Sequence, residues 1–446
     1  MPASSVLDDA PLSGFHKRLA LYSSGGPFLD GYILSIVGVA LVQLGPQLRL
    51  SDAAQGLIGA SALIGIFCGA FLGGYLTDRF GRQMLYTVDL IAIIGCSVAQ
   101  FWAADPVWLF VLRLLIGMAV GADYPIATSL LAEFTPRRYR GPLLGGLMVM
   151  WFVGAATAYV VGEALLTIGA TGWRWMLASP ALPAAVIVML RLGTPESPRW
   201  LAKKGRVDEA NAVMRKVFGD QADISDLPEE ERESAGLVLL WRSGYLGRML
   251  FVSAFWTCSI VPLFAVYAFG PRILGALHLQ GRLVNVGSAL ITVFFVVGCV
   301  LAMVVINRMG RRALLIHSFV WSGLALLLLG VFPSAPAGVI IVLFAAYAVL
   351  IGGAQNLQWI YPNELFPTEI RGTAVGLASS LSRVGAAVGT YLVPLALTGW
   401  GIGTTMLTAA AITLLGAVIS LRWAPETRGL ALHESAALAD PALSRP

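Results

Sequence analysis

Charged residues are scarce in this sequence. Asp, Glu, Lys and Arg make up only 12% of its 446 residues, and 57% of the residues are hydrophobic. A typical soluble protein carries about 25% charged residues. Many apolar stretches also reach the length of about 20 residues that a membrane-spanning helix needs. These runs are too long and too numerous for the core of a soluble protein, so the composition favours a polytopic helical membrane protein.

Cysteine and histidine are also rare. The four cysteines all fall inside apolar runs, so the sequence predicts no disulfide framework. The four histidines are scattered without metal-ligand spacing, and the sequence contains no P-loop and no credible Ser/His/Asp order. We therefore expect no enzymatic activity, no cofactor and no metal. No cleavable signal peptide is visible, because residues 1–18 are polar and no apolar segment with a cleavage site follows.

The apolar runs, bounded by charge and by Gly or Pro clusters, predict twelve spanning helices. They cover residues 19–44, 54–77, 84–104, 107–132, 142–168, 174–193, 248–274, 283–306, 313–332, 337–361, 372–397 and 401–422. The longest polar segment separates six runs from six. The sequence thus predicts an N-terminal lobe (1–193), a cytoplasmic linker with short amphipathic helices (194–247), and a C-terminal lobe with a short tail (248–446).

The positive charges lie in short segments between these runs. The net charge of +5 therefore indicates membrane orientation and not a nucleic-acid ligand. Alternate segments hold most of the Lys and Arg residues, which predicts a protein of the inner or plasma membrane with both termini in the cytoplasm. The segments on the outer side hold only Arg49, Arg174, Arg272 and Arg282.

The two halves of the sequence echo each other. "YLTDRFGRQ" (75–83) follows the second run, and "VINRMGRRA" (305–313) follows the eighth. Likewise, "EFTPRRYRG" (133–141) follows the fourth run and "ELFPTEIRG" (364–372) follows the tenth. Both pairs are offset by six helices, which is the pattern of transporters built from two parallel repeats.

These stretches resemble the major facilitator superfamily. "GGYLTDRFGRQ" is very close to the superfamily's signature between helices two and three. "RLLIGMAVG", "PESPRWL" and "PETRG" resemble its sugar-porter and metabolite:proton symporter branches, and "GADYPIATSLLAEF" resembles its phosphate-permease branch. The resemblance covers nearly the whole chain and implies an all-α membrane protein with two six-helix lobes. The seventh run lacks the glutamine pair of sugar porters and the aspartate of phosphate permeases.

Charged residues at the predicted cytoplasmic helix ends are expected to act in gating. A carboxylate such as Asp78 is stabilised there by the positive end of a helix dipole. The resemblance to sugar porters implies an ion-pair network between the lobes that breaks when the inner side opens. Its expected members are Asp78, Arg79, Arg82, Glu133, Arg140, Glu196, Arg199, Glu364, Arg371, Glu426 and Arg428. A single exposed pair contributes about 0–1 kcal/mol, so several together are needed to bias the equilibrium.

Charged residues inside the apolar runs are the candidates for proton coupling. Asp30 lies near the membrane midplane, where a charge is costly and a functional role is the default interpretation. The resemblance implies that Asp30 pairs with Arg113 on the fourth run. Asp123 is either a second protonation site or a structural partner. Asp89 and Glu163 lie nearer to helix ends, where a structural role is expected.

Arg383, near the middle of the eleventh run, favours an anionic substrate, because arginine binds carboxylate or phosphate through two donors. The resemblance to organic-anion symporters supports this interpretation. The alternative is that Arg383 pairs with a carboxylate or a carbonyl of its own lobe. The other candidate binding residues are Tyr32, Tyr124, Trp151, Trp256, Gln355, Gln358 and Trp359.

The sequence as a whole favours a proton-coupled symporter that imports a small organic anion, such as a carboxylate. Its expected partners are the substrate, protons and the lipid bilayer, and we expect a monomer. Four alternatives remain: a transporter of a neutral solute such as a sugar or polyol, a phosphate transporter, an exporter or antiporter, and a sensor on a transporter scaffold.

Overall fold

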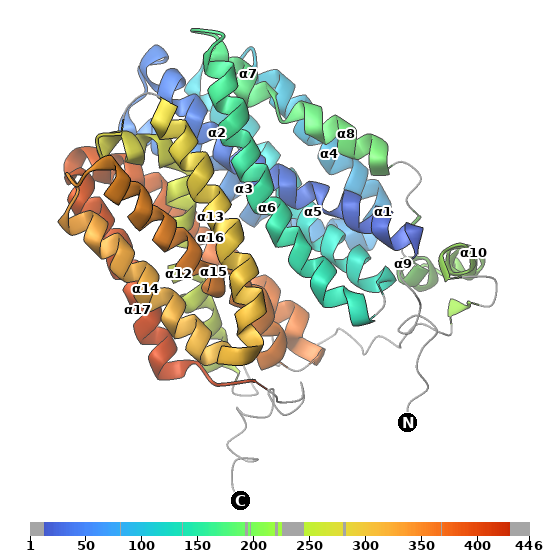
Figure 1. Ribbon diagram of the computed structural model, residues 1–446. Coiled ribbons are helices and arrows are strands. Elements are labelled where there is room, and N and C mark those ends of the chain that lie inside the picture. Colours follow the sequence, from blue (N-terminus) through green and yellow to red (C-terminus); the bar gives the residue numbers. More distant parts are fainter. Residues whose placement is uncertain are drawn as a thin grey trace, which may run out of the picture. The chain divides into compact units, whose positions relative to one another are not determined.

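The structure, a computed structural model, is helical throughout the part of the chain that it describes (Figure 1). The described residues are 13–80, 82–135, 137–191, 195–196, 198–218, 222–224, 245–279, 282–366 and 368–428. The first helices are α1 (Gly14–Ser23), α2 (Gly25–Gln47), α3 (Asp52–Phe80), α4 (Arg82–Gln100), α5 (Pro106–Phe134), α6 (Arg137–Leu166), α7 (Gly172–Ala178) and α8 (Ala181–Arg191). Then follow α9 (Pro198–Lys203), α10 (Val207–Phe218), α12 (Leu246–Ala276), α13 (Arg282–Met309), α14 (Arg311–Val331), α15 (Ala337–Leu365), α16 (Thr368–Gly399) and α17 (Gly401–Trp423).

Twelve helical segments of the described chain are long and apolar enough to cross a membrane. They coincide with the twelve predicted runs, so the expected all-helical membrane protein is confirmed. One segment joins α1 to α2, and another joins α7 to α8 across Ser179 and Pro180. α9 and α10 lie in the segment predicted to be the linker, and the rest of 194–247 lies largely outside the described residues.

The chain divides into two compact units. Unit 1 comprises Met1–Ile36, Ser61–Ala158 and Leu165–Glu230, and unit 2 comprises Val37–Ala60, Tyr159–Ala164 and Glu231–Pro446. The division cuts through three helices: residues 37–47 of α2, 52–60 of α3 and 159–164 of α6 belong to unit 2. The predicted boundaries of two lobes and a linker remain a prediction.

Within unit 1, α4 packs against α5 and α8, and in unit 2 α14 lies beside α17 (Figure 1). Small residues let the helix backbones approach closely. A Cβ atom on Gly117 of α5 would lie 2.1 Å from the carbonyl oxygen of Ala62 on α3. The glycine spacing of "RLLIGMAVG" therefore has a packing role.

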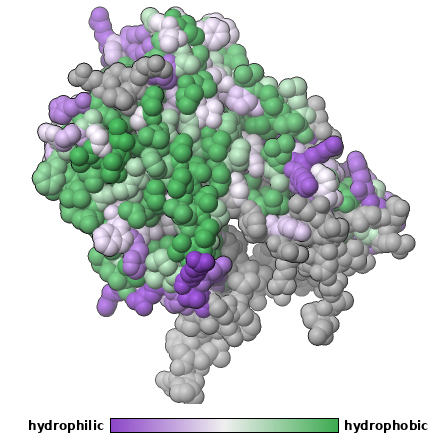
Figure 2. All heavy atoms as spheres, viewed as in Figure 1, coloured by the Kyte–Doolittle hydropathy of each residue, from purple (hydrophilic) through white to green (hydrophobic). Residues whose placement is uncertain are grey.

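The face of α13 and α14 that Figure 2 shows is largely apolar. Figure 2 shows hydrophobic side chains over α13 and α14, with hydrophilic residues gathered near the helix ends. Large exposed side chains on these helices and on α17 include Val297, Leu301, Trp321 and Leu415. Water would not favour such a surface, whereas lipid tails would.

α12 contains a kink, and a side chain of α6 compensates for it. Phe269 has non-helical backbone angles, and Pro271 follows two residues later. Pro271 has no N–H with which to satisfy the carbonyl of Tyr267 four residues before it. Instead, the Tyr159 hydroxyl donates a hydrogen bond to that carbonyl at 3.1 Å. A carbonyl that a proline frees inside a membrane helix needs another donor, and Tyr159 supplies one here.

Candidate functional site

Asp30 of α2 has a buried carboxylate that accepts a hydrogen bond from an indole. The residue Asp30 is 2% exposed. Trp151 of α6, also buried, donates from Nε1 to Asp30 Oδ2 at 2.7 Å. The two predicted site residues therefore belong to one hydrogen-bonded pair within unit 1. Sequence reasoning placed Asp30 in proton coupling and Trp151 in substrate binding without linking them.

Two glycines explain how α2 and α6 approach closely enough for this bond. A Cβ on Gly31 would lie 1.9 Å from the Trp151 carbonyl oxygen, and a Cβ on Gly154 would lie 2.0 Å from the Phe28 carbonyl oxygen. Any larger residue at either position would push the two backbones apart. The "DGY" sequence of residues 30–32 thus places the Asp30 carboxylate directly before Gly31, whose missing side chain lets α6 approach α2.

Tyr32 and Arg113 are two further predicted site residues of unit 1. The Tyr32 hydroxyl lies 2.7 Å from Ser179 Oγ at the break between α7 and α8, and its ring stacks on Phe28. Arg113 is 1% exposed on α5. The predicted pairing of Asp30 with Arg113 remains a prediction. Ser179 has no motif that would have revealed it in the sequence.

Asp123 forms a buried ion pair that the sequence did not predict. Arg191, the last residue of α8, donates from Nη1 to Asp123 Oδ1 at 2.9 Å. Both side chains are at most 4% exposed. Arg191 lies at the end of the sixth apolar run, where an arginine normally indicates no more than a helix end.

A polar cluster in unit 2 brings together α12 and α15. Gln358 donates from Nε2 to Ser259 Oγ at 2.5 Å and to Gln355 Oε1 at 3.0 Å. Gln355 in turn donates to the Ser259 carbonyl oxygen at 3.3 Å. All three residues are buried. The two predicted glutamines therefore share one site, and Ser259 is the member that sequence reasoning missed.

Two predicted tryptophans adjoin this cluster in sequence and in space. The rings of Trp256 and Trp359 meet edge to face with centroids 5.4 Å apart. Trp256 precedes Ser259 by one helical turn, and Trp359 directly follows Gln358. The structure thus groups four of the predicted binding residues of unit 2 around the contact between α12 and α15.

Arg383 is half-buried on α16, and its guanidinium lies over an aromatic ring of α12. Its Cζ atom is 5.1 Å from the centroid of the Phe264 ring. A cation over an aromatic face is stabilised by the ring quadrupole while its N–H donors stay available at the edge. This geometry suits a cation that presents hydrogen-bond donors to an anion.

An ion pair in unit 2 joins two helices at their predicted outer ends. Arg272 of α12 donates from Nη2 to Asp52 Oδ1 at 2.7 Å and from Nη1 to Gln55 Oε1 at 2.8 Å. Asp52 and Gln55 belong to the first turn of α3. Each half of the sequence thus contributes one helix to this contact. No motif singled out these residues.

Two glutamates from similar tripeptides bind the N-termini of corresponding helices. Glu196 of "PES" accepts from the Gln83 N–H of α4 at 3.0 Å. Glu426 of "PET" accepts from Arg311 N at 2.9 Å and Arg312 N at 3.2 Å, at the start of α14. A carboxylate is favourable at the positive end of a helix. Position 310 favours glycine for two reasons. Its φ is +89°, and a Cβ on Gly310 would lie only 2.5 Å from Glu426 Oε2.

Other predicted gating residues of unit 2 gather near Glu426. Arg311 donates to Glu364 Oε1 at 2.9 Å, and Thr427 Oγ1 donates to Glu364 Oε2 at 2.5 Å. Arg428 donates from Nη1 to the Arg308 carbonyl oxygen at 2.7 Å. These contacts all lie within unit 2, and the predicted network between lobes remains a prediction.

Eight predicted residues lie outside the part of the structure in which side chains are described. Their backbone belongs to α3, α4, α5, α6, α9 and α16. They are Asp78, Arg79, Arg82, Tyr124, Glu133, Arg140, Arg199 and Arg371.

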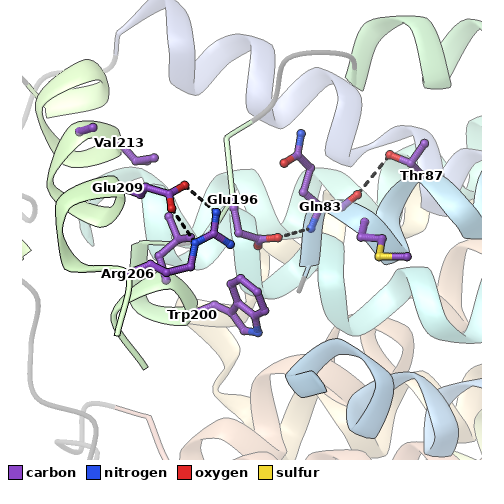
Figure 3. A pocket seen from close by; sticks show the side chains of 10 residues that line it. Gln83, Thr87, Glu196, Trp200, Arg206, Glu209 and Val213 are labelled. Atoms are coloured by element: carbon purple, nitrogen blue, oxygen red, sulfur yellow. Dashed lines mark hydrogen bonds and ion pairs between the residues drawn. The ribbon is translucent and has the colours of Figure 1, made fainter. Parts of the chain in front are cut away.

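A pocket in unit 1 lies where α9 and α10 approach the start of α4 (Figure 3). Glu196 points toward Gln83, while Arg206 and Glu209 face each other across two hydrogen bonds of 2.6 Å. These bonds from the guanidinium lower the pKa of the exposed Glu209 carboxyl. The pocket contains none of the residues predicted to bind substrate.

The twelve spanning helices, the repeated motifs and the polar side chains inside the helices define a secondary transporter of the major facilitator fold. The chain matches the family described as sugar (and other) transporter over residues 16–439. It therefore belongs to this family, whose members are transporters.

Relatives of known sequence support the same class. YaaU of Escherichia coli (strain K12), named as a metabolite transport protein, is 45% identical over 98% of this chain and 98% of its own length. YgcS of the same strain, named as an inner membrane metabolite transport protein, is 39% identical over 96% of this chain and 95% of its own length. The fold is similar to that of the xylose transporter XylE of E. coli. The matched XylE structure shows that transporter in a partially occluded inward open conformation. That structure has a TM-score of 0.80 and 22% identity, and the match covers 94% of this chain and 100% of XylE.

Proposed function

We propose that this protein is a proton-coupled symporter that imports a small organic anion, with a carboxylate as the favoured substrate. The observation that carries the proton coupling is the buried Asp30 carboxylate with its Trp151 donor. An indole N–H can donate to a carboxyl oxygen whether the carboxyl is ionised or protonated. Asp30 can therefore gain and lose a proton without losing its position. XylE, the fold neighbour, is described as a proton:xylose symporter.

The anionic substrate is inferred from Arg383. An arginine inside a spanning helix is costly, and such residues typically belong to substrate pathways. Its cation–π contact with Phe264 holds the guanidinium while leaving donors for a carboxylate. The Trp256–Trp359 pair adds an apolar face that suits the organic part of such a substrate.

A neutral sugar or polyol is the second candidate. The buried amides of Gln355 and Gln358 are the kind of groups that bind hydroxyls, and the fold neighbour is a xylose transporter. Against this candidate, both amides already bond to Ser259 and to each other.

Net charge movement separates the two candidates. One proton with one monovalent carboxylate moves no net charge, whereas one proton with a neutral sugar moves one positive charge inward. Ligands are first found by thermal-shift screening of purified protein against carboxylates, sugars, phosphate and amines, since a bound ligand raises apparent stability. We expect carboxylates to bind and their uptake into proteoliposomes to be electroneutral. Sugar binding with an inward positive current would overturn the proposal.

Substitution of Arg383 tests its role directly. We expect Arg383→Gln to weaken carboxylate binding at least tenfold, about 1.4 kcal/mol. Arg383→Lys keeps the charge but loses the planar fork, so we expect an intermediate loss. Unchanged affinity in Arg383→Gln would contradict an anion-binding role.

A further inference from the structure

Unit 1 contains a second buried carboxylate beside Asp123. Asp89 of α4 lies close enough to Asp123 of α5 for the two carboxyl groups to interact. Arg191 of α8 and Tyr86 of α4 complete the cluster, and all four residues are at most 4% exposed. Two acids thus share one cation in a place sealed from water.

Arg191 contacts both Asp123 and Tyr86. Its Nη1 and Nη2 donate to the two Asp123 oxygens at 2.9 and 3.5 Å. Nη1 also donates to the Tyr86 carbonyl oxygen at 2.9 Å, and Cζ lies 3.2 Å from the centroid of the Tyr86 ring. The guanidinium therefore directly neutralises the Asp123 carboxylate.

Asp89 contains an oxygen that requires a donor. Its Oδ1 accepts from Leu90 N at 2.6 Å, but its Oδ2 has no hydrogen-bond partner among the described residues and is fully buried. The carboxylate of Asp123 next to it can only accept. A buried polar atom without a partner is costly, and two adjacent carboxylates cannot both remain ionised at low cost. A proton on Asp89 removes both problems, because the resulting O–H donates to Asp123.

Among the residues whose side chains are described, the charged groups that act on Asp89 are Asp123 and Arg191. Tyr86, one turn before Asp89 on α4, is the titratable neighbour. His16, the buried histidine of α1, lies 2.7 Å from Ser13 Oγ. α2 presents Gly26, where a Cβ would lie 1.7 Å from Asp123 Oδ2. The α2 backbone therefore lies directly against the Asp123 carboxylate.

We propose that Asp89 and Asp123 together hold one proton, with Arg191 balancing the remaining charge, as a proton-binding site separate from Asp30. Gly26 and Asp30 are four residues apart on α2 and so share a face. Movement of α2 away from α5 would admit water to the pair, and the Asp89 O–H would then release its proton to that water. The role in transport rests on the proposed function; the shared proton does not.

Infrared spectroscopy of the purified protein tests the shared proton without any substrate. Asp30→Asn serves as the background, so that Asp30 cannot contribute. At neutral pH we expect a carbonyl band of a protonated carboxyl that shifts in D2O and disappears when Asp89→Asn is added. Asp89→Asn leaves the Asp123–Arg191 pair in place, and its amide can donate to Asp123, so the fold is expected to persist.

Two further variants make the result specific. Asp89→Glu keeps a carboxyl and should keep a protonated band, while Asp105→Asn, at the exposed start of α5, should leave the band unchanged. A band that survives Asp89→Asn, or no such band at all, would overturn the proposal. In proteoliposomes, Asp89→Asn in the otherwise unmodified protein should lower accumulation driven by a pH gradient at least fivefold. Unchanged accumulation with a lost band would disprove the transport role alone.

Discussion

The Trp151 indole N–H donates to Asp30 Oδ2 across 2.7 Å, and this bond joins α2 to α6 inside unit 1. It explains why a carboxylate is tolerated in the middle of a spanning helix. The glycines at positions 31 and 154 remove the side chains that would otherwise separate the two backbones. The close approach of α2 and α6 and the single Trp151 donor together stabilise a carboxylate inside an otherwise apolar helix contact.

Trp151→Phe should shift the pH dependence of uptake. A hydrogen bond to a charged acceptor contributes about 1.5–3 kcal/mol, against about 0.5–1.5 kcal/mol for a neutral one. Losing the donor therefore costs the ionised Asp30 about 1 kcal/mol more than the protonated form, which corresponds to about one pH unit. Protonation then occurs at higher pH, so proton-driven uptake should persist about one unit further into the alkaline range. Trp108→Phe, at an exposed position on α5, serves as the control, and identical profiles for both variants would contradict the role of this bond.

Gly31→Ala should destabilise the protein. Its Cβ would meet the Trp151 carbonyl oxygen at 1.9 Å, and backbone cannot yield as a flexible side chain can. We expect a loss of about 1–3 kcal/mol, measured as a lower midpoint of thermal unfolding in detergent. Gly95→Ala on α4 meets nothing within 4 Å and should be neutral or slightly stabilising, since alanine favours helix. Equal midpoints for the two variants would count against the close approach.

Tyr159→Phe should also lower stability, because the Tyr267 carbonyl at the α12 kink would lose its donor. A buried group left without its partner costs about 1–3 kcal/mol. Tyr347→Phe is the matched control: that hydroxyl is buried and has no hydrogen-bond partner in the described chain, so its removal should cost little. The order of the two unfolding midpoints decides the point, and a Tyr347→Phe midpoint below that of Tyr159→Phe would contradict the compensation.

The Asp52–Arg272 contact should open during each transport cycle. We expect a short thiol cross-linker between Asp52→Cys and Arg272→Cys to stop uptake, in a background without the four native cysteines. In the variants that carry only one of the two cysteines, neither the cross-linker nor a reductant should change the rate of uptake. Full uptake by the cross-linked protein would show that this end of the helices does not move.

The sequence was sufficient for the fold because hydropathy and charge act over whole helices. Twelve runs and two repeated loop motifs predicted the helices, their number and the family. It was also sufficient to single out Asp30, since a charge at the midplane is rare. It could not reveal that Trp151 is the donor to Asp30, because that contact depends on how α2 and α6 cross.

The partners of Asp123 and of the two glutamines were missed for a similar reason. Arg191 looks in the sequence like a charge at a helix end, and Ser259 looks like a small packing residue. Only the packing of α8 and α12 against their neighbours gives them their roles. By contrast, the repeated "PES" and "PET" tripeptides were visible, and pairing them would have indicated two equivalent carboxylates at helix starts.

The measurement that tests proton coupling most directly is accumulation of a bound carboxylate by proteoliposomes under an inward proton gradient. Asp30→Asn keeps the shape of the side chain and an acceptor for Trp151, but it cannot bind or release a proton. We predict that wild-type protein concentrates the substrate and that Asp30→Asn only equilibrates it across the membrane. Concentrative uptake by Asp30→Asn at the wild-type level would contradict the account.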